Sequence, residues 1–257
     1  MTKGYVLYNP LAGDRQGIED AKLLQILLDD ELEYYDITEI TDYSAFLQGV
    51  EENSYLVIIG GDGTLHRFVN ATEGLEIRQE ILYFPTGCRN SFAKGQGKAF
   101  YGNPFPVTQV LKQLPSVEVK GRRYRFVSGV CVGFRDCFRP RRLKVIADKK
   151  MYAYNRVWGT AAVCGSFCEG ILSTGKQAAD SDQRTLSVML LHGTGRLRAL
   201  CIRSRLFKGK RIVRPKWIAV HTGHEITVEF DCPIQLEIDG ETVPDVTCFR
   251  VSCPSCD

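Results

Sequence analysis

From residue 4 to about residue 114, short apolar runs alternate with segments whose apolar residues recur every three or four positions. Short runs indicate strands, and the three- and four-residue spacing indicates amphipathic helices. In the first helix, Ile18, Ala21, Leu24 and Leu28 share one face, which we expect to pack on a sheet. The expected order is strand Tyr5–Tyr8, helix Gly17–Leu28, strand Glu33–Ile37, helix Tyr43–Val50, strand Tyr55–Ile59, helix Leu65–Thr72, strand Ile81–Phe84 and helix Ser91–Lys94. Such alternation predicts an α/β domain with a parallel sheet.

After Pro115 the pattern changes to short strands separated by turn residues, with two helical stretches near Tyr152–Cys164 and Gly195–Leu206. This pattern is typical of an antiparallel β-sandwich or barrel. The expected strands are Arg123–Val127, Leu186–Leu191, Trp217–His221, Ile226–Phe230, Ile234–Ile238 and Thr247–Val251. We therefore expect two domains, residues 1–118 and residues 119–257, and leave open whether the last residues return to the first domain.

Composition changes this picture little. The chain has 257 residues, of which 44% are hydrophobic and 25% are charged, as in ordinary globular proteins. No apolar run approaches the roughly 18 residues of a membrane span. Because the N-terminal residues lead directly into a strand, without the pattern of a signal peptide, we expect a cytoplasmic protein.

The chain contains ten cysteines, mostly in apolar strand and helix contexts. Without a signal peptide, reduced and buried thiols are the better interpretation. Cys253 and Cys256 form a CxxC pair, but zinc would need two further ligands, for which only Cys232, Cys248, His221 or His224 are available. We favour a C-terminal tail with two spare thiols.

Charge is distributed unevenly, although the formal net charge is only +3. Residues 120–150 hold eleven Lys and Arg against two Asp, and residues 196–216 hold nine Lys and Arg with no acidic residue. A basic second domain would be attracted to anionic phospholipid, which suggests a position at the inner face of the membrane. The alternative is a solvated basic surface. No recognised nucleic-acid-binding motif is present, and the sequence leaves open whether the protein is a homodimer.

The segment Tyr55–Thr64 suggests the chemistry, because an apolar strand runs directly into Gly60-Gly61-Asp62-Gly63-Thr64 and then into a helix. Glycines let backbone N–H groups approach an anion, and the N-terminus of a helix adds partial positive charge. A carboxylate among these glycines is suitably placed to bind Mg²⁺ or to orient a hydroxyl beside phosphate groups. A purely structural strand–turn–helix corner is the alternative.

Two further corners carry small or polar residues where strands end, namely Asn9–Gly13 and Pro85–Ser91. In an open parallel sheet, ligands bind outside the carboxyl ends of the strands. Neither the GxGxxG dinucleotide fingerprint nor the GxxxxGK[ST] phosphate loop is present. We therefore expect a phosphate-binding crevice of a different kind.

These residues resemble the diacylglycerol kinase catalytic domain superfamily, which includes bacterial lipid kinases and sphingosine kinases. The resemblance rests on Asn9-Pro10…Gly13 for NPxSG, Gly60–Asn70 for GGDGTxxEVxN, Pro85–Lys94 for PxGTxNDFAR, and Asp239-Gly240-Glu241 for a late DGE motif. NAD kinases also carry GGDGT, but the late DGE favours lipid kinases. The implied fold is an NAD kinase/diacylglycerol kinase-like α/β domain followed by a C-terminal β-sandwich.

The resemblance implies transfer of the γ-phosphate of ATP to the hydroxyl of a lipid such as diacylglycerol, with Mg²⁺, as in phospholipid biosynthesis. Glu241 would be the general base, and Asp62 would also be catalytic. Candidate Mg²⁺ ligands are Asp62 and Asp239. The nucleotide would contact Asn9, Thr38, Gly60, Gly61, Asp62, Gly63, Thr64, Leu65, His66, Gly87, Cys88 and Asn90. For His66, a position on the helix surface is the alternative.

The chain departs from the family pattern at several positions. Cys88 and Arg89 replace a threonine and a small residue, and Ser91 replaces an aspartate. A second family aspartate, at the start of a later strand, corresponds to Ser187. Each lost carboxylate weakens the affinity for a hard cation. The sequence therefore leaves a catalytically impaired nucleotide- or lipid-binding relative as the alternative function.

Overall fold

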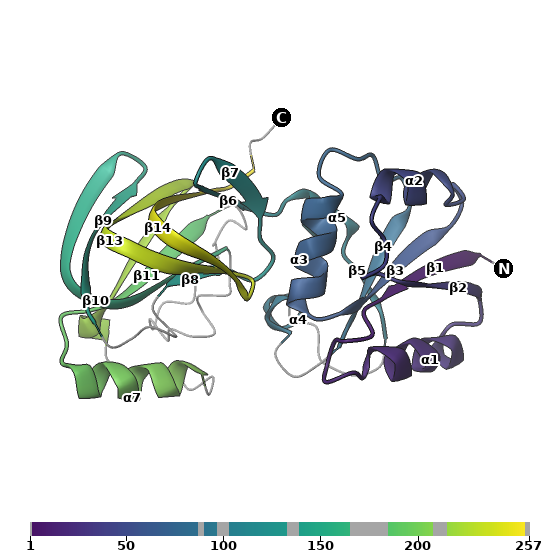
Figure 1. The fold of residues 1–257 in the computed structure, drawn as a ribbon, viewed down its shortest axis with the longest axis horizontal. Helices are drawn as coiled ribbons and strands as arrows, with labels where there is room; N and C mark the ends of the chain where they lie inside the picture. Colours follow the sequence, from purple (N-terminus) through teal and green to yellow (C-terminus); the bar gives the residue numbers. More distant parts are fainter. Residues whose placement is uncertain are drawn as a thin grey trace. The chain divides into compact units, whose positions relative to one another are not determined.

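The structure is a computed structural model that describes residues 2–86, 90–96, 103–132, 139–164, 185–207 and 215–254 (Figure 1). It consists of two compact units, Met1–Gln113 and Leu114–Asp257, which are described separately below. The predicted boundary after residue 118 falls inside strand β6 (Ser116–Val119) of the second unit. The last strand, β14 (Glu241–Ser252), pairs with β6, so the described C-terminal residues stay in the second unit.

The first unit has the predicted α/β architecture. Its sheet has the order β2-β1-β3-β4-β5, with parallel pairing except between β4 and β5. The strands are β1 (Lys3–Tyr8), β2 (Glu31–Asp36), β3 (Tyr55–Gly60), β4 (Glu80–Pro85) and β5 (Phe105–Pro106), and the helices are α1 (Gly17–Leu27), α2 (Tyr43–Gln48), α3 (Asp62–Ala71), α4 (Ser91–Gly95) and α5 (Thr108–Lys112). Because parallel strands end at the same edge, the loops after β1, β3 and β4 are brought together.

Helix α1 covers one face of this sheet. Ala21 and Leu24 pack against Val6, Val57 and Phe84 in a buried cluster. Leu24 is fully buried, which stabilises the fold by about 2 kcal/mol. The predicted contact of Ile18 is wrong, because its side chain is 45% exposed. The buried face instead follows Gly17, Ala21 and Leu24, at spacings of four and three residues.

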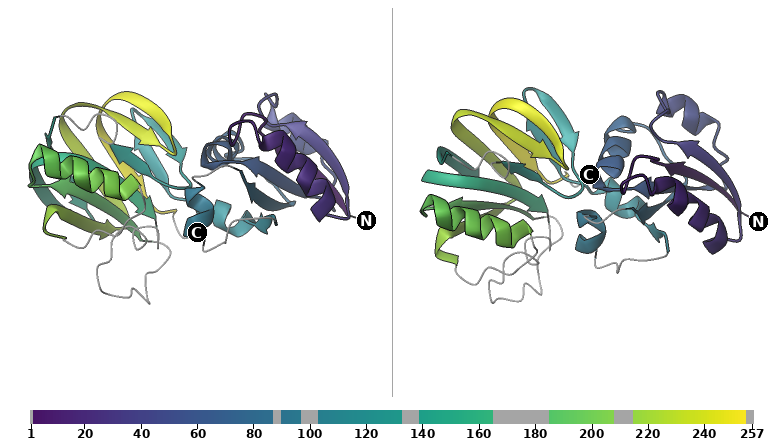
Figure 2. Two further views of the ribbon diagram at one scale, coloured as in Figure 1. Left: turned by 90° about the horizontal axis from the view of Figure 1, so that it is seen from below. Right: turned by 60° about the horizontal axis from the view of Figure 1, so that its bottom comes forward.

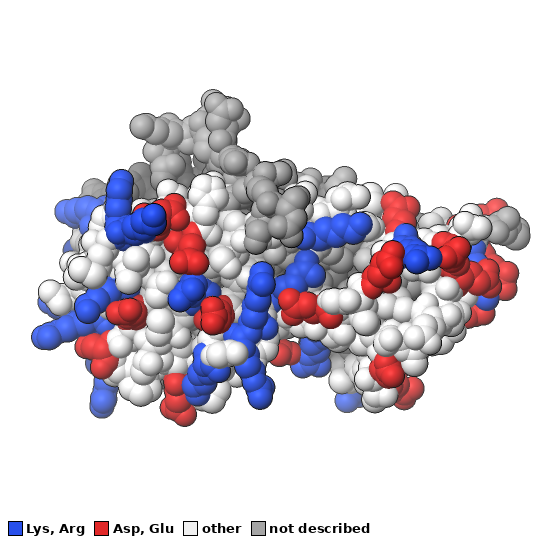
Figure 3. All heavy atoms as spheres, turned by 90° about the horizontal axis from the view of Figure 1, so that it is seen from above, with Lys and Arg blue, Asp and Glu red and all other residues white. Residues whose placement is uncertain are grey.

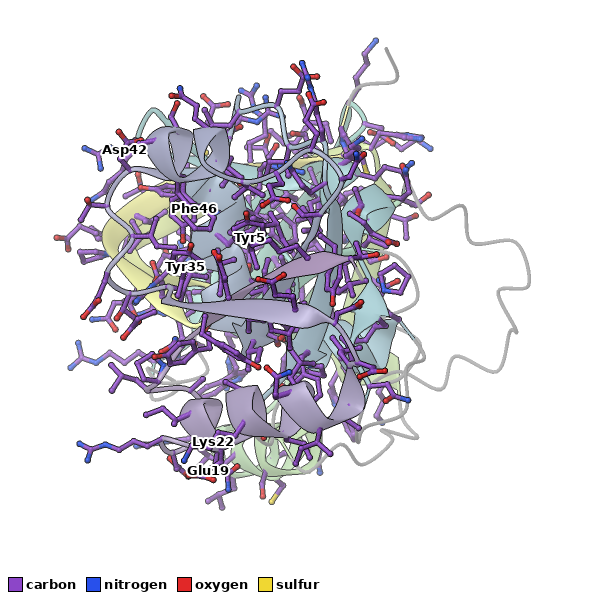
Figure 4. All side chains as sticks on the ribbon, turned by 90° about the vertical axis from the view of Figure 1, so that its right-hand side faces the viewer. Tyr5, Glu19, Lys22, Tyr35, Asp42 and Phe46 are labelled. Atoms are coloured by element: carbon purple, nitrogen blue, oxygen red, sulfur yellow. The ribbon has the colours of Figure 1, made fainter. Side chains whose placement is uncertain are left out.

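The opposite face carries aromatic side chains, since successive residues of a strand point to opposite sides. Tyr5 of β1 stacks on Tyr35 of β2 with ring centroids 6.2 Å apart, and Tyr35 meets Phe46 of α2 edge-on at 5.0 Å (Figure 4). Asp42 begins α2 by accepting hydrogen bonds from the N–H groups of Ser44 and Ala45. Edge-on and offset aromatic pairs are favourable, so this cluster fixes α2 on the sheet.

The second unit contains a nine-stranded antiparallel sheet that curls around its own core, as the sequence predicts. The strand order is β12-β11-β10-β8-β13-β14-β6-β7, with β9 pairing to β10 and β13. The remaining bounds are β7 (Arg122–Arg125), β8 (Val130–Val132), β9 (Arg141–Ala147), β10 (Lys150–Cys164), β11 (Leu186–His192), α7 (Arg196–Phe207), the 3₁₀ helix η1 (Pro215–Trp217), β12 (Ile218–Gly223) and β13 (Glu225–Ile238). The helix near Gly195–Leu206 is confirmed as α7.

Two predictions for the second unit are wrong. Residues 152–164 form most of strand β10 rather than a helix. Pairing irregularities between Tyr154 and Val157 and between Val157 and Gly159 interrupt the side-chain alternation that identifies a strand. The two strands expected at 226–230 and 234–238 are one strand, β13, whose pairing shifts between Glu229 and Ile234.

Acidic and basic side chains differ in their distribution over the surface. On the face shown in Figure 3, red carboxylates gather over the first unit, whereas blue Lys and Arg side chains spread over the second. Helix α7 has twelve residues. Within the described part of the chain, no helix has both the length and the apolar character needed to cross a membrane.

Candidate nucleotide-binding site

The glycine-rich corner after β3 is a tight turn into helix α3. Gly61 is the N-cap residue, and its carbonyl accepts hydrogen bonds from the N–H groups of Thr64 and Leu65. A Cβ atom on Gly60 would lie 2.5 Å from the Thr64 hydroxyl oxygen, so only glycine fits there. The first N–H groups of a helix have no acceptor within the helix, which makes this end of α3 attractive to an anion.

The corner after β1 is joined to the same helix. The Asn9 side-chain amide donates a hydrogen bond to the Thr64 hydroxyl at 2.8 Å, and Asn9 Oδ1 accepts one from the N–H of Leu11. A Cβ on Gly17 would lie 1.9 Å from the Asn9 carbonyl oxygen, so the start of α1 also packs directly on this loop. Asn9 and Thr64, 55 residues apart in the chain, therefore form one polar edge.

Asp62 links the corner after β3 to the corner after β4. Its carboxylate accepts hydrogen bonds from the N–H groups of Ser91, at 2.7 Å, and Phe92, at 3.3 Å. These groups begin helix α4, whose N-cap residue, Asn90, adopts a left-handed conformation with φ of 33° and makes no side-chain cap. Asp62 thus supplies the cap that Asn90 does not, and its negative charge suits the N-terminus of a helix.

Tyr83 of β4 and Thr86, the residue after β4, support this corner. The apolar pattern of β4 did not single out Tyr83, whereas Thr86 belongs to the predicted corner Pro85–Ser91. The hydroxyl of the fully buried Tyr83 donates to the Gly60 carbonyl at 2.9 Å, and the N–H of Thr86 donates to the same oxygen. Burial and the nearby Asp62 charge raise the pKa of Tyr83 well above its usual value, so the phenol stays neutral and keeps donating. Burial likewise raises the pKa of Asp20 on α1, against the opposing effect of the Thr86 hydroxyl.

The other predicted nucleotide contacts lie in different environments. Thr38 follows β2 and is exposed, with its N–H and hydroxyl both bonded to Asp36. Leu65 is fully buried, so only its backbone could face a ligand. His66 is 4% exposed, and Asn70 donates to its carbonyl, so the helix-surface alternative for His66 is wrong. Gly87 and Cys88 lie outside the described residues.

Gly61 gives a test of whether a ligand fits this corner. A Cβ there would meet its nearest atom, the Thr86 carbonyl oxygen, at 3.6 Å, an ordinary contact distance, and its φ of −88° suits any residue. The packing of the chain therefore does not require glycine at this position. Close approach of a phosphate to the backbone would require glycine here, because a side chain would hold the phosphate oxygens away from the N–H groups.

The corner offers few side chains that could bind Mg²⁺. Among the described residues, no three His, Cys, Asp or Glu side chains lie close enough together to form a metal centre. Asp62 is half-buried at the corner and could hold Mg²⁺ together with phosphate oxygens, which is how this ion is often bound. Ser91, beside Asp62, adds no charge.

In the second unit, Asp239 and Gly240 form the two-residue turn between β13 and β14, and Glu241 is the first residue of β14. Asp239 and Gly240 have φ of 49° and 95°, as a tight hairpin turn requires. Asp239 accepts four hydrogen bonds, from the N–H groups of Val127, Ser128 and Gly129 and from the Ser128 hydroxyl. Its carboxylate is thus engaged by the loop after β7, which leaves little capacity for the metal role predicted for it. Glu241 follows at the start of β14, exposed.

The first unit is thus an α/β domain with an anion-attracting corner at the carboxyl edge of its sheet. Residues 3–114 match the family model of the diacylglycerol kinase catalytic domain, which confirms the resemblance over this part of the chain. A relative, the Bacillus subtilis protein named "Putative lipid kinase YtlR", is 30% identical over a match that covers 37% of this chain. The match spans only a third of the length of that relative, 33%.

Solved structures share the fold of the whole chain. A diacylglycerol kinase from Bacillus anthracis superposes with a TM-score of 0.64 and 18% identity, over 98% of this chain and 93% of that one. An NAD kinase from Archaeoglobus fulgidus, solved in complex with ATP, gives 0.50 and 14% identity, over 99% and 91%. At these identities the likeness concerns the fold, which is the predicted NAD kinase/diacylglycerol kinase-like type.

Proposed function

We propose that the protein is an ATP-dependent lipid kinase, which transfers the γ-phosphoryl group of ATP to the hydroxyl of diacylglycerol or a related lipid alcohol. The observation that carries this proposal is the corner at Gly60–Thr64, where Asn9, Asp62 and the N-terminus of α3 are held together by hydrogen bonds. The family of residues 3–114 and the kinase fold of the solved structures support it.

In this proposal, the first unit binds the nucleotide. The phosphates would lie against Gly61 and the first turn of α3, with Asn9 and Asn90 as neutral hydrogen-bonding groups at the edge. Mg²⁺ held by Asp62 and the phosphate oxygens would neutralise charge that develops during transfer. Tyr83, bonded to Gly60, keeps the corner fixed before the nucleotide arrives.

The acceptor chemistry falls to Glu241 of the second unit. As the lipid hydroxyl oxygen bonds to the γ-phosphorus and the bond to ADP breaks, Glu241 would take the hydroxyl proton. Its exposed position on a hairpin fixed by Asp239 suits a base that must reach a substrate. Which lipid is accepted depends on apolar surface that carries no local sequence signature.

A catalytically impaired nucleotide-binding relative is the second candidate. It is favoured by Ser91, beside Asp62, and by Ser187, which is buried on β11, because both serines stand where the family has an aspartate. Such a protein would bind ATP and transfer no phosphate.

The deciding experiment supplies labelled ATP and Mg²⁺ with detergent micelles of diacylglycerol, monoacylglycerol or a sphingoid base, and measures labelled lipid. The kinase proposal expects one class of lipid to be phosphorylated, and Asp62→Ala to give only background. Tight ATP binding without product from any lipid would establish the second candidate instead.

A further inference from the structure

Helix α7 and the 3₁₀ helix η1 form a cationic aromatic cluster on the second unit. The Trp217 ring lies between two cations, with Arg198 Cζ 4.5 Å and Lys216 Nζ 4.9 Å from its centroid. Both distances are in the range of favourable cation–π contacts. Arg198 and Lys216 are exposed, and Trp217 is half-buried.

One face of α7 is fixed to the sheet, and the other faces outward. Ala199 and Ile202 pack with Trp158 and Leu191 in a separate small core. Leu197, on the outward face, is 81% exposed, the largest exposure among the described large apolar side chains apart from Ile26 at 82%. Seen from below in Figure 2, α7 lies across the strands as the outermost layer on that side.

The surrounding sequence is entirely without acidic residues. Between Asp182 and Glu225 the chain has ten Lys and Arg and no Asp or Glu. A segment of this charge attracts an anionic partner, and it contains no carboxylate of its own to neutralise it.

We propose that Leu197, Arg198, Lys216 and Trp217, called here the α7 patch, dock the protein on membranes of anionic phospholipid. The two cations would approach lipid phosphates and carboxylates, each contributing about fivefold to binding. Trp217 has an amphipathic ring of the kind that prefers the membrane interface, and Leu197 would enter the acyl boundary. A nucleic acid would use the cations but give exposed Leu197 no apolar phase to enter, so the patch favours a membrane.

Sedimentation with vesicles of phosphatidylcholine, with or without phosphatidylserine, tests the proposal. Wild type should bind only the anionic vesicles and be released as salt rises, because exposed charges are screened. The double variant Arg198→Glu with Lys216→Glu should bind at least 25-fold more weakly, and Leu197→Ser should bind several-fold more weakly. The matched control is Arg122→Glu with Arg123→Glu, which makes the same charge change on exposed residues of β7.

Tryptophan fluorescence gives an independent measurement, since the chain has two tryptophans and Trp158 is 5% exposed. In Trp158→Phe, the Trp217 emission should shift to shorter wavelength on anionic vesicles. Should that variant fold poorly, brominated phosphatidylcholine in the anionic vesicles should quench wild-type emission through Trp217.

Three results would overturn the proposal: equal weakening by the β7 control, no change at Trp217 in bound protein, or equal affinity for single-stranded DNA that Leu197→Ser leaves unaltered. The last result would identify a nucleic-acid surface. None of these measurements contains ATP, so a failed kinase assay leaves the membrane result standing.

Discussion

The carboxylates of Asp62 in the first unit and Asp239 in the second both accept hydrogen bonds from backbone N–H groups of a segment far away in the sequence. Asp62 receives two, from the start of α4, and Asp239 receives three together with a hydroxyl, from the loop after β7. Asp62 also lies at the corner that attracts an anion. The difference suggests that Asp62 joins structure to ligand binding, whereas Asp239 serves the hairpin that carries Glu241.

The largest expected effect tests the Asp62 half of this comparison. Asp62→Ala removes the acceptor of two N–H groups and the carboxylate proposed to hold Mg²⁺, so lipid phosphorylation should fall to background. Loss of the cap should also lower the free energy of unfolding of the first unit by about 1 kcal/mol. Turnover and urea unfolding measure the two effects. Unchanged nucleotide affinity and rate would show that the corner is not the phosphate site.

Glu241→Gln tests whether the hairpin formed at Asp239 carries the general base. The amide keeps the size and the hydrogen-bonding shape of the side chain but cannot take a proton, so kcat should fall by about 10²–10⁴ with ATP affinity unchanged. The matched control is Glu225→Gln, at the exposed start of β13 in the same unit. An equal fall in both variants would contradict a base at Glu241.

Asp239→Ala measures how firmly that hairpin is fixed. It leaves three N–H groups and a hydroxyl without their acceptor, so the second unit should lose about 2–4 kcal/mol of stability. Activity should fall by more than the unfolded fraction, because the hairpin that carries Glu241 is no longer fixed, and the Mg²⁺ dependence should stay that of wild type. A shifted Mg²⁺ requirement in well-folded Asp239→Ala would instead restore the metal role of this residue.

Ser91→Asp sharpens the comparison by adding charge to the Asp62 corner. The new carboxylate, at the position where the family has aspartate, should lower the Mg²⁺ concentration for half-maximal rate several-fold. Ser187 is less suitable for the same change, because it is 9% exposed and a new charge there would be buried. Ser91→Asn, without charge, is the control, and an equal gain in both variants would argue against a metal effect.

The first unit was largely predictable because its elements follow simple periods. Three of its four parallel strands, β1, β3 and β4, end before a small or polar residue, so the carboxyl edge could be located from the sequence. Helix α4 and strand β4 were predicted within one residue at each end. The sequence pattern could not predict contacts between distant residues. The Asn9–Thr64 hydrogen bond joins residues 55 positions apart, and the hydroxyl that bonds to the Gly60 carbonyl belongs to Tyr83 in an apolar strand.

The second unit was less predictable because its strands are irregular. Around Val157 and Trp158, consecutive side chains are buried on opposite sides of β10, in contact with two different cores. Arg156 adopts φ of 59°, so the alternation is broken at this point. A pattern search therefore finds no strand there. The capping role of Asp239 was also hidden, since its partners lie about 110 residues earlier in the chain.

The smallest expected effect is a pH dependence of stability, which should differ between the two units. His221 of β12 shares a 2.7 Å hydrogen bond with the Tyr154 hydroxyl, and the Tyr152 ring lies 4.1 Å from its own. Burial lowers the pKa of His221, as does the charge of nearby His192, and burial lowers the pKa of His192 itself. The neutral form of both histidines is therefore more favoured in the folded state than in the unfolded chain.

A histidine whose folded pKa is depressed contributes stability above its unfolded pKa of about 6.5, and this is lost as pH falls through the folded value. The second unit should thus become less stable between pH 7 and pH 5. Hydrogen exchange in peptides from β10–β12 should report faster opening at pH 5, after correction for the intrinsic exchange rate. His221→Gln cannot take a proton, so it should flatten this dependence, with Tyr154→Phe as the variant that removes only the hydroxyl. Equal acid sensitivity in peptides from β1–β4, or an unaltered slope in His221→Gln, would assign the effect to the protein as a whole rather than to this cluster.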